Sequence, residues 1–400
     1  MTHTLYRQKL EQAGRILGEL GIDAWLIYVR ETALNPDPVT ELLWDFAAIW
    51  PAAFVITADG RRIATGVVHD APTFEASGLF TEVRPFEKVP DETLPALLQR
   101  LDPQNIALNY SLGEVAADGL SHGLFLNLQR MLAGTPYPQR FTSAETLIGL
   151  LRQRKLPEEL ALLKEAARTA GEILDRFSAA VHTGMSETEM AELFLGQVRA
   201  RGIETSWDAG HCPNMNAGPH TGRGHLGPLP EVTLQPGDVL NVDFGVKQNG
   251  FCSDQQRVWY ALRPGETEPP ESVMAPFRAV AGAIQAGFAA LRPGVEGWRV
   301  DAAARDFLTA AGYPEYLHAL GHNVGRYAHD GGVAMLCPRW PSYGERAYGR
   351  LEPGQLLTIE LGVWTEHGYI GLEEEALVTA SGAEWFWPPQ TEPILIASRQ

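Results

Sequence analysis

Cysteine is scarce in this 400-residue chain, which contains three cysteines far apart in the sequence. That number and spacing exclude a disulfide framework and a thiolate zinc site, and they fit a reduced, cytoplasmic protein. Long apolar runs are also lacking, because the longest, residues 46–56, is far shorter than the ~20 residues of a membrane-spanning helix. The polar N-terminal segment has no apolar core of the kind found in signal peptides. We therefore expect a cytoplasmic protein without a membrane partner.

Positive charge is in short supply as well. The chain has 32 lysines and arginines against 49 aspartates and glutamates, which gives a formal net charge of −17. This excess would repel nucleic acids and anionic membranes, so neither is expected as a partner. The apolar share of 45% and the charged share of 20% are typical of a folded globular protein. At roughly 100–200 residues per domain, the length predicts two or three domains.

The first 150 residues alternate between helical and strand-like patterns. Residues 5–20 place apolar side chains at helical spacing, and Gly21 can end that helix. Residues 24–29 follow as a short buried strand, and Asp59-Gly60 is a strong signal for a hairpin turn. The other elements predicted here are a helix at 91–101, a strand at 105–109 and a mostly helical segment at 114–131. Together these patterns predict a small α/β domain over residues 1–150.

An internal repeat organises the rest of the chain. Residues 234–246 (LQPGDVLNVDFGV) align without gaps with residues 351–363 (LEPGQLLTIELGV), at an offset of 117 residues. A pair of predicted helices precedes each segment, at 157–181 with 186–201 and at 271–291 with 296–311. Residues 155–400 are therefore expected to contain two copies of a helix–helix–hairpin unit related by a pseudo-twofold axis. The expected fold class is α+β, with this domain following the smaller one.

Each copy carries two carboxylates near a predicted hairpin turn. Asp243 and Asp254 flank the turn of the first hairpin, and Glu360 and Glu373 flank the turn of the second. We expect both pairs to be cross-strand neighbours, with Cβ atoms roughly 4.5–5.5 Å apart. The repeat relates Asp243 to Glu360, so the pseudo-twofold axis would bring all four carboxylates together. The alternative is that these acids face solvent at the edges of the hairpins.

Four carboxylates in one core would be destabilising without cations. The neighbouring positions in both strands are apolar, and like charges in such surroundings repel and raise each other's pKa values. Two divalent metals would neutralise the four charges. His318, His322 and His329 lie within twelve residues and can supply a nitrogen ligand, which favours a first-row metal such as Mn, Fe, Co or Zn over Ca or Mg. His220, in the loop before the first hairpin, could also reach the site.

This combination resembles the pita-bread metallopeptidases, a family that includes methionine aminopeptidase, aminopeptidase P, prolidase and the metal-free relative creatinase. The matching segments are Asn241-Val-Asp243-Phe-Gly245, Ser253-Asp254, Gly321-His322-Asn-Val-Gly325, Thr358-Ile-Glu360 and Leu372-Glu373. Residues 1–150 resemble the creatinase/prolidase N-terminal domain in size and pattern, and methionine aminopeptidases usually lack that domain. The resemblance implies a pita-bread catalytic domain over residues 155–400. Retention of all five ligand positions argues against creatinase.

The resemblance also implies a role for each matched residue. The metal ligands would be Asp243, Asp254, His322, Glu360 and Glu373, with Asp254 and Glu373 bridging two metals. Glu360 would also serve as general base for the metal-bound water. His220 and His329 would stabilise the tetrahedral intermediate and assist proton transfer. His318 would lie beside a proline-binding pocket.

Two positions depart from the pattern of the family. Gly371 stands where an arginine is usual, two residues before the last glutamate ligand, and Gln256 stands where a threonine is usual. The missing arginine removes a partner at the leaving-group end of the site. A basic residue from elsewhere, such as a partner subunit, would compensate for it.

The resemblance favours an Xaa-Pro dipeptidase (prolidase) that uses two divalent metals, with manganese favoured and Co, Zn or Fe as alternatives. Such an enzyme must recognise both ends of a proline dipeptide. Arg30 and Asp37, which bound a turn-rich segment, are the candidate substrate-binding residues, and Asp37 would contact the substrate ammonium across the interface of a homodimer. A solvated loop is the alternative for this segment. Two other functions remain open: aminopeptidase P acting on longer peptides, and a non-catalytic binding protein on a decayed peptidase fold.

Overall fold

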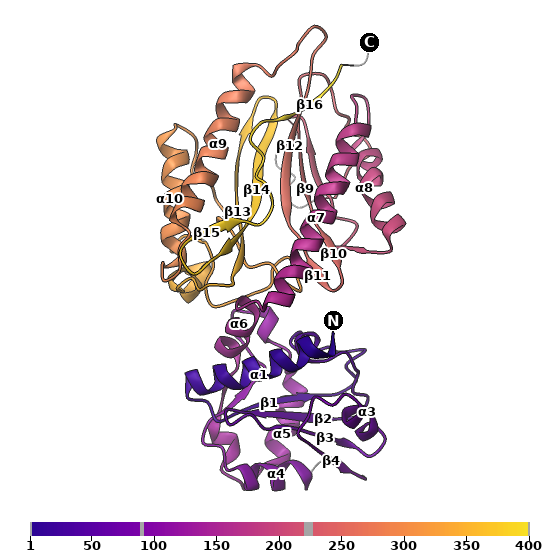
Figure 1. Ribbon diagram of the computed structural model, residues 1–400, viewed down its shortest axis with the longest axis vertical. Coiled ribbons are helices and arrows are strands. Elements are labelled where there is room, and N and C mark those ends of the chain that lie inside the picture. The colour runs from indigo at the N-terminus through magenta and orange to yellow at the C-terminus, as the bar shows by residue number, and fades with distance from the viewer. Residues whose placement is uncertain (1, 89–91, 220–226, 399–400) are drawn as a thin grey trace. The chain divides into compact units, whose positions relative to one another are not determined.

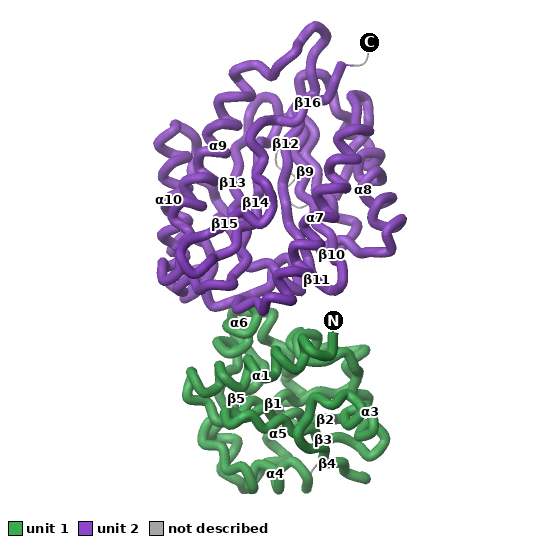
Figure 2. Tube along the Cα trace, viewed as in Figure 1, with its two compact units in different colours: residues 1–152 green, residues 153–400 purple. Residues whose placement is uncertain are grey.

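The computed structural model describes residues 2–88, 92–219 and 227–398. The chain divides into two compact units, residues 1–152 and 153–400, which Figure 2 shows in green and purple. We call them unit 1 and unit 2. Each unit is built around its own sheet and its own buried apolar side chains.

Unit 1 contains a mixed six-stranded sheet (Figure 1). Its strands are β1 (Ala24–Val29), β2 (Ala52–Thr57), β3 (Arg62–Val67), β4 (Glu82–Phe86), β5 (Ile106–Leu108) and β6 (Phe141–Ser143). They are hydrogen-bonded in the order β4-β3-β2-β1-β5-β6, with β2 antiparallel to both of its neighbours and the other pairs parallel. Gly60, at a φ of 88°, lies in the turn between β2 and β3, which confirms the predicted hairpin.

Helices cover the sheet of unit 1. They are α1 (His3–Leu20), α2 (Thr40–Leu43), α3 (Ala71–Ala76), α4 (Thr93–Leu101), α5 (His122–Met131) and α6 (Glu145–Gln153), with short 3₁₀ segments η1 (Val115–Ala117) and η2 (Tyr137–Arg140). Val55 of β2 packs with leucines of α4 and α5, whereas its neighbour Phe54 contacts Phe74 of α3, with ring centroids 5.2 Å apart. The alternation of side chains along β2 therefore buries both faces of the sheet.

Unit 2 contains most of the strands. They are β7 (Glu204–Thr205), β8 (Asn214–Ala217), β9 (Val239–Phe244), β10 (Val246–Gln248), β11 (Phe251–Cys252), β12 (Gln255–Ala261), β13 (Leu356–Thr365), β14 (Gly368–Val378), β15 (Ala383–Trp385) and β16 (Ile394–Ile396). The large sheet runs β13-β14-β12-β9-β8, with β15 paired to β14 and β16 paired to β12. A small sheet, β11-β10-β7, extends the first hairpin.

Two helix pairs pack against the strands of unit 2, as the repeat predicts. The helices are α7 (Pro157–Ala180), α8 (Glu187–Arg201), α9 (Glu271–Ala290) and α10 (Gly297–Ala310), followed by the 3₁₀ segment η3 (Pro341–Tyr348). The α7–α8 pair and the α9–α10 pair lie on opposite sides of the strands (Figure 1). The α7–α8 pair forms one apolar cluster with β8, β9 and β12, and the α9–α10 pair forms another, mainly with β13 and β14. Ser186 begins α8 as the N-cap of a capping box with Glu189.

In the part of the chain that the structure describes, α9 is the one helix long and apolar enough to cross a membrane. Its apolar residues Val273, Phe277, Val280 and Ile284 are buried together with side chains of β13 and β14. Core helices of globular proteins pass the same test of length and composition. The position of α9 against the sheet accounts for its apolar character.

A buried ion pair fixes the loop that follows α10. Lys155 Nζ lies 2.7 Å from Asp330 Oδ2, and both side chains are 1% exposed. The other oxygen of Asp330 accepts a hydrogen bond from the backbone N–H of Arg326, at 3.1 Å. A Cβ at Gly325 would lie 1.9 Å from Asp330 Oδ2, so this position requires glycine. Lys155, at the start of α7, thereby holds the segment that contains the predicted His322 and His329.

We predict that Asp330→Ala destabilises the protein by about 3–5 kcal/mol, because it leaves the Lys155 ammonium buried without its counter-charge. Glu172→Ala is the matched control, since it breaks an exposed pair with Arg168 on the surface of α7 and should cost less than about 1 kcal/mol. Urea denaturation followed by tryptophan fluorescence measures both. Equal losses of stability in the two variants would contradict this account of the loop.

Candidate metal centre

A row of five paired residues crosses the large sheet of unit 2. Glu360 on β13 pairs with Glu373 on β14, and Glu373 pairs with Gln256 on β12. Gln256 pairs in turn with Asp243 on β9, and Asp243 with Asn214 on β8. Directly paired residues of neighbouring strands point to the same face of a sheet. The five side chains therefore lie side by side, and three of them are carboxylates.

The predicted pairing of the second hairpin is confirmed, but that of the first is wrong. Glu360 and Glu373 are direct partners, whereas the partner of Asp243 is Gln256 and Asp254 lies two residues earlier. The difference arises at Gly245, where a Cβ would lie 1.9 Å from the carbonyl oxygen of Ser253. This close approach separates β9 from the short β10–β11 hairpin and leaves Ser253 and Asp254 outside the strands. The Asp254 carboxyl nevertheless lies near that of Asp243, whose charge contributes to the raised pKa of Asp254.

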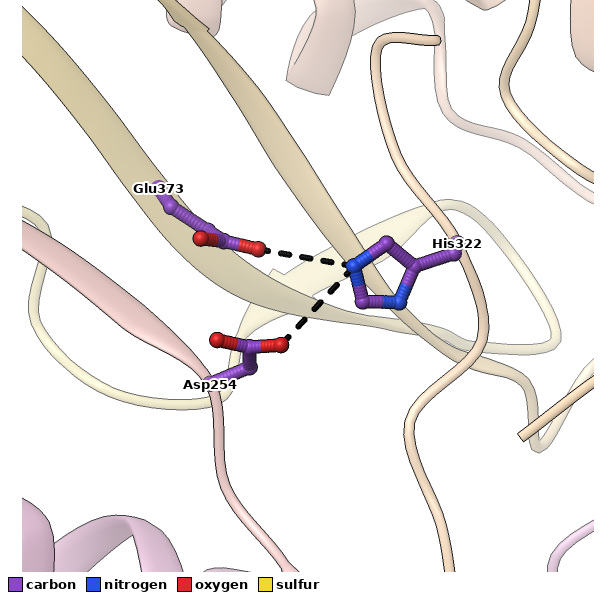
Figure 3. A group of neighbouring side chains, drawn as sticks. All are labelled: Asp254, His322 and Glu373. Carbon is purple, nitrogen blue, oxygen red and sulfur yellow. Dashed lines mark ion pairs between the residues drawn. The ribbon is translucent and has the colours of Figure 1, made fainter. Parts of the chain in front are cut away.

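His322 completes the cluster from a separate loop. Its Nε2 lies 3.8 Å from Asp254 Oδ2, 3.7 Å from Glu360 Oε1 and 3.7 Å from Glu373 Oε1. Figure 3 shows the imidazole pointing between two of these carboxylates. The His322 backbone is held against β13, because its carbonyl oxygen accepts a hydrogen bond from Thr358 N and its own N–H donates to Thr358 Oγ1. The five predicted ligand side chains thus lie in one cluster.

The carboxylates of the cluster are poorly solvated. Asp254 is 5% exposed and Glu373 is 2% exposed. Burial, followed by repulsion from Glu373, raises the pKa values of Asp243, Asp254 and Glu360 well above the usual range. Two buried oxygens of the cluster, Asp243 Oδ1 and Glu373 Oε1, have no hydrogen-bond partner. Acceptors that are buried together without donors are costly unless a cation balances them.

The geometry fits a divalent cation. Ligand atoms of Asp254, His322 and Glu373 all lie within 4.8 Å of one another. Two ligands that are each about 2.1 Å from a tetrahedral ion lie about 3.4 Å apart, close to the 3.7–3.8 Å that separates the His322 nitrogen from the carboxylate oxygens. Carboxylates with one imidazole suit a first-row divalent metal. These residues can therefore hold such a metal with small movements.

Gln256 connects two carboxylates of the row. Its Nε2 donates to Glu360 Oε2 at 3.2 Å and to Glu373 Oε2 at 3.0 Å. The 117-residue offset of the repeat also relates Gln256 to Glu373, so a neutral amide occupies the position that is a carboxylate in the second copy. The sequence marked Gln256 as a departure from the family pattern, and the structure shows that it is the amide donor within the row.

Two glutamates beside the cluster were missed by the sequence analysis. Glu375 accepts a hydrogen bond from Asp254 N at 3.1 Å, and Glu374 forms an ion pair with Arg257 at 3.0 Å. Burial raises the pKa of Glu374 to about 7 and that of Glu375 to about 8. Three consecutive glutamates in an otherwise apolar strand were the available signal. Glu375 holds Asp254 in place, since that residue lies outside the strand ladder.

The remaining histidines of the prediction lie at different distances from the cluster. The exposed His329 packs edge-on against the ring of His322, with centroids 4.3 Å apart. His318 is exposed, and its ring centroid lies 5.4 Å from that of Tyr316. His220 lies outside the described residues.

Asp37 and Arg30 belong to unit 1. Asp37 is 3% exposed, and its carboxylate accepts hydrogen bonds from Asn109 Nδ2 at 2.7 Å and from Val39 N at 3.0 Å. Desolvation raises the pKa of Asp37. This interior position contradicts the expectation of a substrate contact, because both oxygens are used inside unit 1. Arg30 is exposed directly after β1, and its role stays a prediction.

Comparison with known proteins places the chain among peptidases. Residues 161–380 match a model of the family described as metallopeptidase family M24. The chain is 31% identical over 248 residues to a putative dipeptidase of Bacillus subtilis and 30% identical over 247 residues to an Xaa-Pro dipeptidase of Lactobacillus helveticus. These alignments cover 61% and 60% of this chain and 63% and 61% of the relatives. The matches therefore span less than two thirds of those curated relatives.

Solved structures share the fold over nearly the whole chain. An Xaa-Pro dipeptidase from Bacillus anthracis has a TM-score of 0.74 at 22% identity, covering 98% of this chain and 100% of that one. An X-Pro aminopeptidase from Thermotoga maritima MSB8 has a TM-score of 0.71 at 21% identity, covering 97% and 99%. These similarities, together with the family match, confirm the predicted pita-bread fold.

We predict that the metal-free protein loses thermal stability as the pH rises from about 5 to about 8. Glu374 and Glu375 have folded-state pKa values of about 7 and about 8, above the unfolded value of about 4.3. The folded state therefore binds more protons than the unfolded state, and this stabilisation is lost as the pH increases through that window. Melting temperatures in chelator measure the slope, and Mn²⁺ should reduce it. A melting temperature that rises over the same window in chelator would contradict the prediction.

We also predict that Gln256→Leu lowers the affinity for Mn²⁺ by about 10-fold or more, because Glu360 and Glu373 lose the donor that orients them. Isothermal titration calorimetry of the metal-free protein measures the affinity. The matched control is Gln235→Leu, which removes an exposed amide that donates to Thr233. An unchanged affinity in Gln256→Leu would show that the amide does not organise the cluster.

Proposed function

The chain belongs to metallopeptidase family M24, and from that premise we propose that it is an Xaa-Pro dipeptidase (prolidase) acting with two divalent cations, manganese being favoured. The observation that carries the proposal is the group of three carboxylates within 3.8 Å of His322 Nε2, with Asp243 in the same row, in a family of metallopeptidases. An Xaa-Pro dipeptidase of Lactobacillus helveticus among the relatives supports this substrate class.

The proposed ligands are Asp243, Asp254, His322, Glu360 and Glu373. Divalent cations at such a site supply Lewis-acid activation of a water molecule and of the scissile carbonyl. Glu360 is half-buried, and burial raises its pKa, which suits a residue that accepts a proton from the attacking water and passes it to the leaving amine. His329 lies against His322 and would donate a hydrogen bond to the developing oxyanion, together with His220.

Unit 1 is proposed to be a creatinase-type N-terminal domain, and the enzyme is proposed to act as a cytoplasmic homodimer. Support for the domain comes from alignments that cover 98% of this chain with a solved Xaa-Pro dipeptidase. His318 remains the candidate for contact with the proline ring. Arg30 remains a candidate for contact with the substrate.

The dipeptidase proposal predicts that the Mn²⁺-loaded protein hydrolyses Ala-Pro and leaves Ala-Pro-Ala nearly untouched. Chelator should abolish the activity. Glu360→Gln should lower kcat by about 10²–10⁴-fold, because it removes the general base. Glu366→Gln is the matched control, since this side chain is exposed in the turn of the same hairpin. Release of free alanine measures each of these reactions, because hydrolysis of the bond before proline frees the N-terminal alanine of either peptide.

Two results would select the other functions. Efficient cleavage of Ala-Pro-Ala would indicate an aminopeptidase P, an activity that the likeness to the X-Pro aminopeptidase of Thermotoga maritima MSB8 keeps as the second candidate. A purified protein that binds no Mn²⁺ and cleaves neither peptide would indicate a binding protein on a peptidase fold.

A further inference from the structure

Three successive residue pairs lie on the carboxylate face of β13 and β14. They are Glu360–Glu373, Gly362–Gly371 and Trp364–Tyr369, each pair directly opposite in the antiparallel ladder. Residues two apart in a strand point to the same face, so the three pairs form consecutive steps on one surface. The middle step has no side chains, and an aromatic pair lies beyond it.

Tyr369 folds back over the two glycines toward the carboxylates. A Cβ at Gly362 would lie 2.5 Å from the Cζ and Oη atoms of Tyr369, and a Cβ at Gly371 would lie 2.3 Å from its Cε1. The ring therefore covers both glycines, and a side chain at either position would displace it. The space next to Gly371 is occupied by a tyrosine ring and by the Gln256 amide, whose Oε1 would lie 2.8 Å from a Cβ at Gly371.

The Tyr369 hydroxyl lies at the edge of the cluster, over Gly362. Glu360 is close enough for its charge to raise the pKa of Tyr369, and the hydroxyl of Tyr316 is a further neighbour. A neutral phenol has one O–H to donate, so the Tyr369 hydroxyl can serve an acceptor that is bound beside it. The ring of Tyr316 neighbours that of His318, and Tyr369 packs on the exposed Trp364, with centroids 5.1 Å apart.

A dipeptide bound at this cluster needs such a donor. Consecutive Cα atoms are 3.8 Å apart, so the C-terminal carboxylate of a dipeptide lies within one residue of the scissile bond. The carboxylates of the row repel it, and the Gln256 amide already donates to Glu360 and Glu373. Aromatic surfaces also accommodate proline rings. The tyrosines beside the row offer both a hydrogen-bond donor for the carboxylate and an aromatic surface for the proline ring.

We infer that the Tyr369 hydroxyl contacts the substrate and donates a hydrogen bond to the carboxylate of the residue that follows the scissile bond. This inference rests on the proposed dipeptidase function and assigns the leaving-group side of the site to β14. It also replaces the expected basic residue with an uncharged donor from the same chain.

The test compares Tyr369→Phe with the wild type in the Mn²⁺-loaded protein. The phenylalanine ring still covers Gly362 and Gly371, so only the hydroxyl is removed. Free L-proline should bind about 10-fold more weakly by calorimetry, and KM for Ala-Pro should rise by a similar factor, because a hydrogen bond to a carboxylate is lost. The affinity for Mn²⁺ and the melting temperature should remain those of the wild type. Tyr260→Phe is the matched control, since it removes a phenol that donates to Glu266 at the other end of β12.

A second variant, Tyr316→Phe, tests the neighbouring phenol. Because the contact is assigned to Tyr369, Tyr316→Phe should bind L-proline more tightly than Tyr369→Phe does. A loss in Tyr316→Phe as large as that in Tyr369→Phe would overturn the inference. The inference would also be overturned if Tyr369→Phe bound L-proline with the wild-type affinity and had the wild-type KM for Ala-Pro. A loss of Mn²⁺ affinity in Tyr369→Phe that accounts for the weaker proline binding would overturn it as well.

The proposed function can fail separately. If the wild type does not hydrolyse Ala-Pro, the dipeptidase proposal is wrong, and calorimetry with L-proline still decides the role of Tyr369. Proline binding that Tyr369→Phe weakens would support the contact. No binding to the wild type, or equal binding to both proteins, would overturn it.

Discussion

Four carboxylates meet beside one face of the large sheet of unit 2, and their repulsion is the interaction that the surrounding structure must accommodate. Burial and mutual charge raise the pKa values of Asp243, Asp254 and Glu360. The fold does not relieve this by exposing them, because Asp254 and Glu373 are almost fully buried. The arrangement is reasonable only when a cation shares the site, since uncompensated charges in a protein interior are destabilising.

Close backbone contacts bring the acids and the imidazole together. Glycine at 245 and at 321 lets strands and loops approach so closely that a Cβ would lie 1.9 Å from a carbonyl oxygen. At 325, glycine makes room for the buried pair of Lys155 and Asp330, which fixes the loop after His322. These contacts lie outside the cluster, yet they decide where its ligands are. The candidate metal site is therefore a property of the whole repeat and of the loops between its copies.

Much of this architecture could be predicted from the sequence, because the repeat is strong and its helices have clear ends. The Glu360–Glu373 pairing followed from the symmetry of a simple hairpin. The same reasoning misplaced Asp254, since a break at Gly245 changes the register and nothing in a single sequence reports it. The prediction of a substrate contact for Asp37 was wrong for another reason. A turn-rich composition predicts a loop, but it does not reveal that the Asp37 carboxylate packs against Gly119 in the interior of unit 1. Both errors concern packing, which sequence patterns describe poorly.

The two departures from the family pattern form one structural unit rather than two independent losses. Gln256 and Tyr369 both occupy the space around Gly371, and both place neutral groups beside Glu360. Arg257, one residue from Gln256, pairs with Glu374 and so does not neutralise the row. Among the described residues of the row, hydrogen bonds orient the carboxylates without cancelling their charge. A bound divalent cation would therefore have to balance this negative charge, and the affinity for that cation would influence the protonation of Glu360.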